Sequence, residues 1–163
     1  MRSQIPLWPF AILALLLALG LWQRRTREVS WSAPVAVAAA FLALSFYGVA
    51  SAFGVSLFPL LAWAAGLVLA VTLGSQVFAP RGLRPTAHPN RVLVPGSWLP
   101  LGLMLSIFAV KFLVGFVAGA GLTVGTSAWF APAVSLALGV LSGGFVVRAL
   151  AVLRVSRRRK SDA

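Results

Sequence analysis

Residues 129–160 read WFAPAVSLALGVLSGGFVVRALAVLRVSRRRK. The first part of this stretch, from Trp129 to Val147, carries no charged residue and is long enough to cross the hydrocarbon core of a bilayer as a helix. The second part contains Arg148 and ends in a cluster of basic residues. A long apolar run that ends in positive charge is typical of a membrane-spanning helix that leaves the lipid on the cytoplasmic side.

Apolar runs of this kind occupy almost the whole 163-residue chain. Charged residues make up 10% of it, against roughly 25% in a soluble domain, so the chain lacks the polar surface to cover its apolar bulk in water. Each run approaches or exceeds the ~17–25 residues that a spanning helix needs. We therefore expect an all-α fold with one membrane domain over residues 1–163, a polytopic bundle of five transmembrane helices at about residues 5–22, 34–53, 57–78, 98–118 and 129–153.

The basic residues predict how this bundle is oriented. Twelve of the fourteen lysines and arginines follow the first, third and fifth runs, whereas the gaps after the second and fourth runs are uncharged. Because positive charge stays on the cytoplasmic side, we expect the N-terminus outside, the C-terminus in the cytoplasm, a cytoplasmic loop at 79–97 and a basic tail at 154–163. Positive charge directly after Trp22, with no small-residue cleavage motif, favours a retained helix over a cleaved signal peptide.

Composition excludes several classes of function. The chain has no cysteine and a single histidine, His88, so we expect no disulfide, no metal site and no cofactor. We expect no nucleic-acid binding, because the basic residues follow the topology and are not interleaved with aromatic residues. A hydrolase dyad of Lys111 with Ser51 or Ser135 is chemically conceivable. No nucleophile turn or oxyanion motif accompanies these residues, so we expect no enzyme.

Lys111 is the one charged residue well inside an expected span. A helical side chain leans toward the N-terminus of its helix, which directs this ammonium group away from the nearer, outer surface. Counting residues from the helix ends brings Tyr47, Ser51 and Ser135 to a similar depth. We hypothesise that Lys111, Tyr47, Ser51 and Ser135 form a ligand-binding site for an anion, a proton or a lipid headgroup. The alternative is a structural lysine, hydrogen-bonded to Tyr47 and backbone carbonyl groups, that holds two helices together.

Small residues recur at every fourth position on three of the expected helices. Such faces let helix backbones approach closely in lipid, where little hydrophobic driving force brings helices together. The predicted packing residues are Gly66, Ala70 and Gly74 on the third helix, Gly115 and Gly119 on the fourth, and Gly139 and Gly143 on the fifth.

The basic tail suggests contact with lipid. Each lysine or arginine near a membrane surface is attracted to anionic lipids by about 1 kcal/mol. The alternative is an anchor that fixes topology without lipid preference, because both roles use the same charges. The expected contacts with anionic lipids at the cytoplasmic face are Arg154, Arg157, Arg158, Arg159 and Lys160.

Two segments suggest a family. Residues 44–53 read LSFYGVASAF, and residues 94–101 read VPGSWLPL, followed by the basic–aromatic pair Lys111–Phe112. These segments resemble an uncharacterised family of small bacterial inner-membrane proteins, a domain of unknown function. The resemblance implies that Tyr47, Ser51, Lys111 and the helix start at Ser97–Trp98 occupy motif positions. It carries no established activity.

The sequence leaves two classes of function open. The first is a non-enzymatic protein of the bacterial inner membrane that acts by assembling with itself or with other membrane proteins through its glycine faces. The second is a small transporter, channel or lipid-handling protein that uses the polar site around Lys111. Both classes of function imply a multi-pass membrane protein whose main partner is the lipid bilayer.

The charge asymmetry generates a test of topology. A fluorescent protein that matures only in the cytoplasm, fused after Ala163, is expected to fluoresce, whereas alkaline phosphatase at the same position is expected to be inactive. Fusions in the uncharged 119–127 gap provide the control and should give the reverse result. Phosphatase activity at the C-terminus would contradict the predicted orientation.

Overall fold

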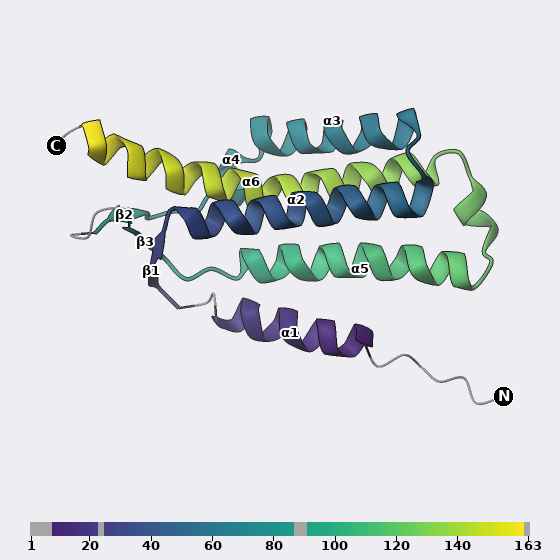
Figure 1. Cartoon of the computed structure of the whole chain (residues 1–163), viewed down its shortest axis with the longest axis horizontal. Helices are drawn as coiled ribbons and strands as arrows, with labels where there is room; N and C mark the ends of the chain where they lie inside the picture. Colours follow the sequence, from purple (N-terminus) through teal and green to yellow (C-terminus); the bar gives the residue numbers. More distant parts are fainter. Residues whose placement is uncertain (1–7, 23–24, 87–90, 162–163) are drawn as a thin grey trace.

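The computed structural model describes residues 8–22, 25–86 and 91–161 and is mostly helical (Figure 1). Long helices run side by side along the long axis of the molecule, and a small sheet lies at the end where the C-terminus emerges. The elements in chain order are α1 (Trp8–Trp22), β1 (Arg27–Ser30), α2 (Ser32–Phe53), α3 (Leu57–Leu73), α4 (Ser75–Phe78), β2 (Arg84–Pro85), β3 (Arg91–Val94), α5 (Leu99–Gly119), the 3-10 turn η1 (Thr123–Thr126) and α6 (Phe130–Ser161).

Three of these helices are long and apolar enough to cross a membrane: α2, α5 and residues 130–157 of α6. The all-α membrane architecture expected from the sequence therefore agrees with the structure. The apolar helix α3 has 17 residues, which at 1.5 Å per residue is roughly 26 Å, a little short of a ~30 Å hydrocarbon core. The described part of α1 has 15 residues. The count of five spans and the orientation stay predictions.

Helix α6 is the centre of the bundle. Half of its apolar span is buried, against 22% for α2 and 28% for α5. Helices α2, α3 and α5 all pack on α6, and α1 lies against the outer side of α5 (Figure 1). The other helices are therefore held mainly by their contacts with α6, directly or through α5.

The contact between α3 and α6 brings two backbones together. A Cβ atom on Gly66 would overlap the carbonyl oxygen of Leu136, and one on Gly139 would overlap the carbonyl oxygen of Trp63. One turn further along, a Cβ on Gly143 would lie 2.5 Å from the Cβ of Ala70. In lipid this close approach stabilises helix pairs through van der Waals packing, because apolar burial alone contributes little.

Aromatic rings hold α2 on another side of α6. Phe41 stacks on Phe145 with ring centroids 4.3 Å apart, and Phe53 meets Phe130 edge to face at 6.1 Å. Such arrangements suit the quadrupoles of the rings. Helix α3 therefore contacts α6 through glycines, whereas α2 contacts it through aromatic rings.

The expected third helix, 57–78, is divided at Gly74. The backbone of Gly74 has φ −78° and ψ −2°, its N–H donates to the carbonyl oxygen of Ala70 at 2.9 Å, and the single turn α4 follows. Glycine favours such a break because it is a poor helix former. At the same end of the bundle, α6 continues through most of the expected tail to Ser161. Arginine and lysine are good helix formers, which explains the extension.

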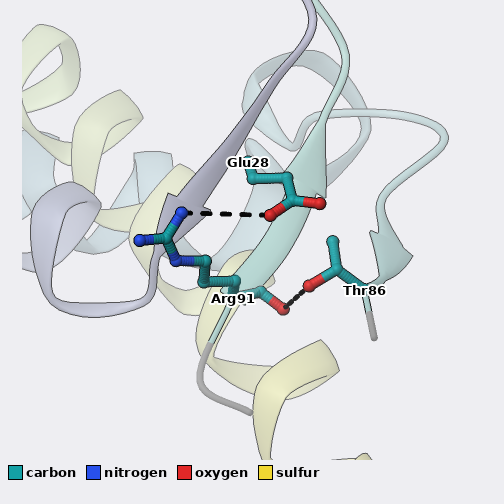
Figure 2. Close-up of polar contacts among 3 residues, drawn as sticks. All are labelled: Glu28, Thr86 and Arg91. Carbon is teal, nitrogen blue, oxygen red and sulfur yellow. Dashed lines mark hydrogen bonds and ion pairs between the residues drawn. The ribbon is translucent and has the colours of Figure 1, made fainter. Parts of the chain in front are cut away.

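Residues 79–97, expected as a loop, contain β2 and β3, which join β1 in an antiparallel sheet of order β1-β3-β2. Arg27 pairs with Val94 and Ser30 with Arg91, while Pro85 sits on the edge strand, where a missing N–H is tolerated. Figure 2 shows two side-chain contacts of this sheet. Arg91 Nη1 lies 3.9 Å from Glu28 Oε2, and Thr86 Oγ1 donates to the carbonyl oxygen of Arg91 at 3.1 Å.

Because α3 and α6 are in such close contact, adding one methyl group between them is expected to lower the stability of the protein strongly. Gly139→Ala is expected to destabilise the protein by about 1–3 kcal/mol, because the new Cβ overlaps backbone that cannot rotate away. Thermal unfolding in detergent, followed by tryptophan fluorescence, measures the change. Gly102→Ala on α5 is the matched control and should be neutral or slightly stabilising, because its Cβ meets nothing within 4 Å. Equal effects of the two substitutions would contradict this packing.

Candidate ligand-binding groove

Helices α2, α5 and α6 together line a groove of about 800 Å³, named here the Lys111 groove. Its walls are apolar and rich in aromatic side chains, with Ser51 and Lys111 as the polar ones. The lining residues are Leu16 from α1; Phe41, Leu44, Gly48, Ser51, Ala52 and Phe53 from α2; Met104, Ile107, Phe108, Lys111, Phe112, Val114, Gly115 and Phe116 from α5; and Val134 and Leu138 from α6.

The ammonium group of Lys111 lies against the backbone of α2. A Cβ on Gly48 would lie 2.5 Å from Lys111 Nζ and 3.0 Å from its Cε, so the missing side chain makes room for the lysine. Lys111 is half-buried. Within the described ranges, no hydrogen bond or ion pair reaches its ammonium group, and the single described carboxylate, Glu28, belongs to the sheet at the end of the bundle.

Ser51 is one turn beyond Gly48 on the same side of α2. Its hydroxyl donates to the carbonyl oxygen of Gly48 at 3.3 Å, and an oxygen that donates in this way still accepts hydrogen bonds. Gly48 thus shares contacts with both polar residues of the groove. The groove therefore offers one cation and one hydroxyl within an apolar wall.

The structure brings together two of the four residues of the hypothesised site. Lys111 and Ser51 line the groove, whereas Tyr47 and Ser135 do not. Tyr47 is 68% exposed on the surface of α2, because one residue of helix rotation separates it from Gly48. Ser135 is fully buried in α6 between groove residues Val134 and Leu138. Residue counts predicted how deep each side chain lies along its helix, but they did not predict the direction in which it points around the helix axis.

Buried serines serve the packing of the helices. Trp63 Nε1 of α3 donates to Ser45 Oγ of α2 at 3.1 Å, and this hydroxyl donates in turn to the carbonyl oxygen of Leu42 at 3.1 Å. Ser142 donates to the carbonyl oxygen of Leu138 in its own helix at 2.7 Å. Sequence reasoning did not single out the Ser45–Trp63 bond, although a tryptophan one turn inside a span needs a partner for its N–H.

The predicted packing residues fall into two groups. Gly66, Ala70, Gly139 and Gly143 lie in the α3–α6 contact, and Gly74 lies against the ring of Phe78. Gly115 and Gly119 face open space on α5, where an added Cβ would meet nothing within 4 Å. Gly115 also lines the Lys111 groove.

The residues expected to contact anionic lipid extend α6 beyond the bundle (Figure 1). The side chains of Arg154 and Arg157 are exposed. Arg158, Arg159 and Lys160 belong to the same helix, but their side chains lie outside the described part of the structure.

Comparison with protein-family models, curated proteins and solved structures finds no match to this chain. The family resemblance of residues 44–53 and 94–101 therefore stays a prediction.

Two of the three fully buried serines among the described residues, Ser45 and Ser135, are expected to respond differently to loss of the hydroxyl. Ser45→Ala leaves the indole N–H of Trp63 without its acceptor and should destabilise the protein by about 1–3 kcal/mol. Ser135→Ala should change stability little, because Ser135 Oγ has no hydrogen-bond partner among the described residues. Thermal unfolding of both variants checks this difference. A larger loss for Ser135→Ala would show that the Ser135 hydroxyl has a binding or packing role.

Proposed function

We propose that this protein binds an amphiphilic anion in the Lys111 groove, as a small lipid-handling or transport protein of the bacterial inner membrane. The observation that carries the proposal is a single ammonium group within an apolar groove of about 800 Å³. The groove falls within the ~300–1,000 Å³ typical of small-molecule sites, which are mainly apolar with a few polar groups that fix orientation. The predicted five-span, N-outside topology is part of this proposal.

The charge of the groove favours an anionic head group. An ionised group away from water is costly unless it is paired, and ionisable residues inside membranes commonly mark ligand or ion pathways. A carboxylate or phosphate on a ligand would pair with Lys111 and accept a hydrogen bond from it. Ser51, nearby on α2, offers a second polar contact to the same head group.

The walls of the groove favour an apolar chain on that ligand. The lining residues Leu44, Phe112 and Phe116 are 46–59% exposed, so the groove opens on a surface that would face hydrocarbon. A hydrated inorganic anion gains nothing from such walls, whereas an acyl chain entering from the bilayer would find contacts as apolar as the lipid it leaves. We infer that the ligand combines one negative head group with at least one hydrocarbon chain.

Assembly through glycine faces remains a second candidate function. Gly115 and Gly119 form an open small-residue face on α5, beside the exposed ring of Phe116. In lipid such a face supports close contact with another helix. The partner would be a second copy of the chain or another membrane protein. We propose no enzymatic activity for either candidate.

A photoreactive long-chain fatty acid tests ligand binding directly. In detergent or nanodiscs, the probe should label peptides from α2 and α5, and Lys111→Met should weaken its binding about tenfold to a hundredfold, because a charge-assisted hydrogen bond is lost. Lys111→Arg should retain much of the binding. The readout is the concentration dependence of labelling, located by mass spectrometry of the peptides.

The matched probe is the fatty alcohol of the same chain length, whose labelling should be weak and indifferent to Lys111→Met. The thermal unfolding of each variant shows whether it folds. Equal labelling by acid and alcohol, in both wild type and Lys111→Met, would rule out an anion site. Native mass measurement of the same preparation addresses the second candidate, because a strict monomer argues against self-assembly.

A further inference from the structure

A second cavity, of about 100 Å³, lies at the end of the bundle that carries the sheet. Three arginines from separate parts of the chain line it: Arg25 before β1, Arg27 at the start of β1, and Arg148 in α6. Prolines from three segments and Phe145 supply much of the remaining wall. We name it the arginine cavity. It belongs to neither the Lys111 groove nor the basic tail.

The fold concentrates positive charge in this cavity and turns the nearby acid away from it. Successive residues of a strand face opposite sides of the sheet, and Arg27 and Val29 line the cavity. Glu28, between them, lies on the other face, where its carboxylate meets Arg91 (Figure 2). Among the described residues that line the cavity, none is acidic.

Arg148 is held in position from the side of α4. Its Nη1 donates to the carbonyl oxygen of Phe78, at the last residue of α4, at 3.5 Å. This bond uses one of five N–H donors on a planar group suited to two-point contact with a carboxylate or phosphate. Arg148 is half-buried, whereas Arg25 is exposed. The cavity therefore has one anchored arginine within it and one at its mouth.

The start of α2 adds to the positive potential. Ala33, Pro34 and Val37 line the cavity and belong to the first two turns of this 22-residue helix. No side chain caps the first turn of α2 within the described structure. The N-terminus of a helix carries about half a positive charge and free N–H groups, which complement an anion that the arginines bind.

The cavity is small. Its volume of about 100 Å³ lies below the ~300–1,000 Å³ typical of small-molecule sites and suits a single small group such as a phosphate. Arginine recognises phosphate with two parallel hydrogen bonds. We propose that the arginine cavity binds a single phosphate group, supplied by the headgroup of an anionic phospholipid. The expected orientation puts this cavity on the cytoplasmic side, where anionic headgroups lie against positive residues.

Lipid-dependent unfolding tests this proposal, and the experiment uses the Lys111→Met variant so that binding in the Lys111 groove does not contribute to the shift. The purified protein in a mild detergent is heated with dioleoyl phosphatidylglycerol, dioleoyl phosphatidylcholine or inorganic phosphate, and the tryptophan fluorescence is followed. The anionic lipid should raise the unfolding midpoint saturably, and the zwitterionic lipid should raise it much less. Inorganic phosphate at matched concentration separates the sources: no shift supports a lipid headgroup, and a comparable shift supports free phosphate at the same site. Equal shifts with both lipids would overturn the proposal.

Substitutions locate the site. Arg25→Gln changes a residue outside the helices and leaves their packing intact. Arg148→Gln removes the anchored guanidinium group. Each substitution should lower the apparent affinity for phosphatidylglycerol about tenfold to a hundredfold. Arg84→Gln is the matched control, because this arginine is exposed in β2 and lies outside the cavity, and it should behave as wild type. Unchanged phosphatidylglycerol affinity in Arg25→Gln and Arg148→Gln, or an equal loss in Arg84→Gln, would place the effect outside the cavity and overturn the proposal.

Discussion

The close contact between α3 and α6 is the interaction on which the rest of the bundle depends. Water drives apolar surfaces together in a soluble protein, but in lipid the surroundings are as apolar as the helices. Stability must then come from packing, and packing is tightest where Gly66 and Gly139 remove the side chains between two backbones. Helix α6 gains its central position in this way, and its other faces become the surface on which α2 and α5 are placed.

The side chains on those faces decide how near each neighbour can come. Stacked rings, Phe41 on Phe145, hold α2 at a distance from α6, and Leu103 of α5 fills the space beside Gly144. Helices α2 and α5 meet where Lys111 lies against Gly48, and the groove is lined by both of these residues. The Lys111 groove follows from this geometry, since its floor is α6 and its walls are the facing sides of α2 and α5.

Four of the fourteen basic residues line two cavities with different surroundings. The whole sequence has two acidic residues and fourteen basic ones, so pairing within the chain can neutralise only a small part of the positive charge. Lys111 meets an apolar groove within the bundle, whereas Arg25, Arg27 and Arg148 meet a small cavity at its end. Both proposed ligands, an amphiphilic anion in the groove and a phospholipid headgroup in the cavity, come from lipids.

The sequence by itself determined the features that depend on composition and local order. Apolar runs long enough to span lipid predicted the helical class, and the bounds of α2 and α5 agree with the predicted ones to within two residues. Spacing of small residues marked Gly66, Ala70, Gly139 and Gly143, because a four-residue period returns to the same helix face. Lys111 was conspicuous because a charge inside an apolar run is rare.

Only the tertiary structure decided what those residues meet. Residue counting gives depth along a helix, but the rotation of each helix follows from packing against its neighbours. Gly48 therefore faces Lys111 while Tyr47 points outward, and Gly115 and Gly119 face open space. The sheet escaped prediction for a related reason: strands of two to four residues carry little periodicity, and β1 pairs with a partner some sixty residues away. Contacts between distant segments depend on three-dimensional arrangement, which no local pattern encodes.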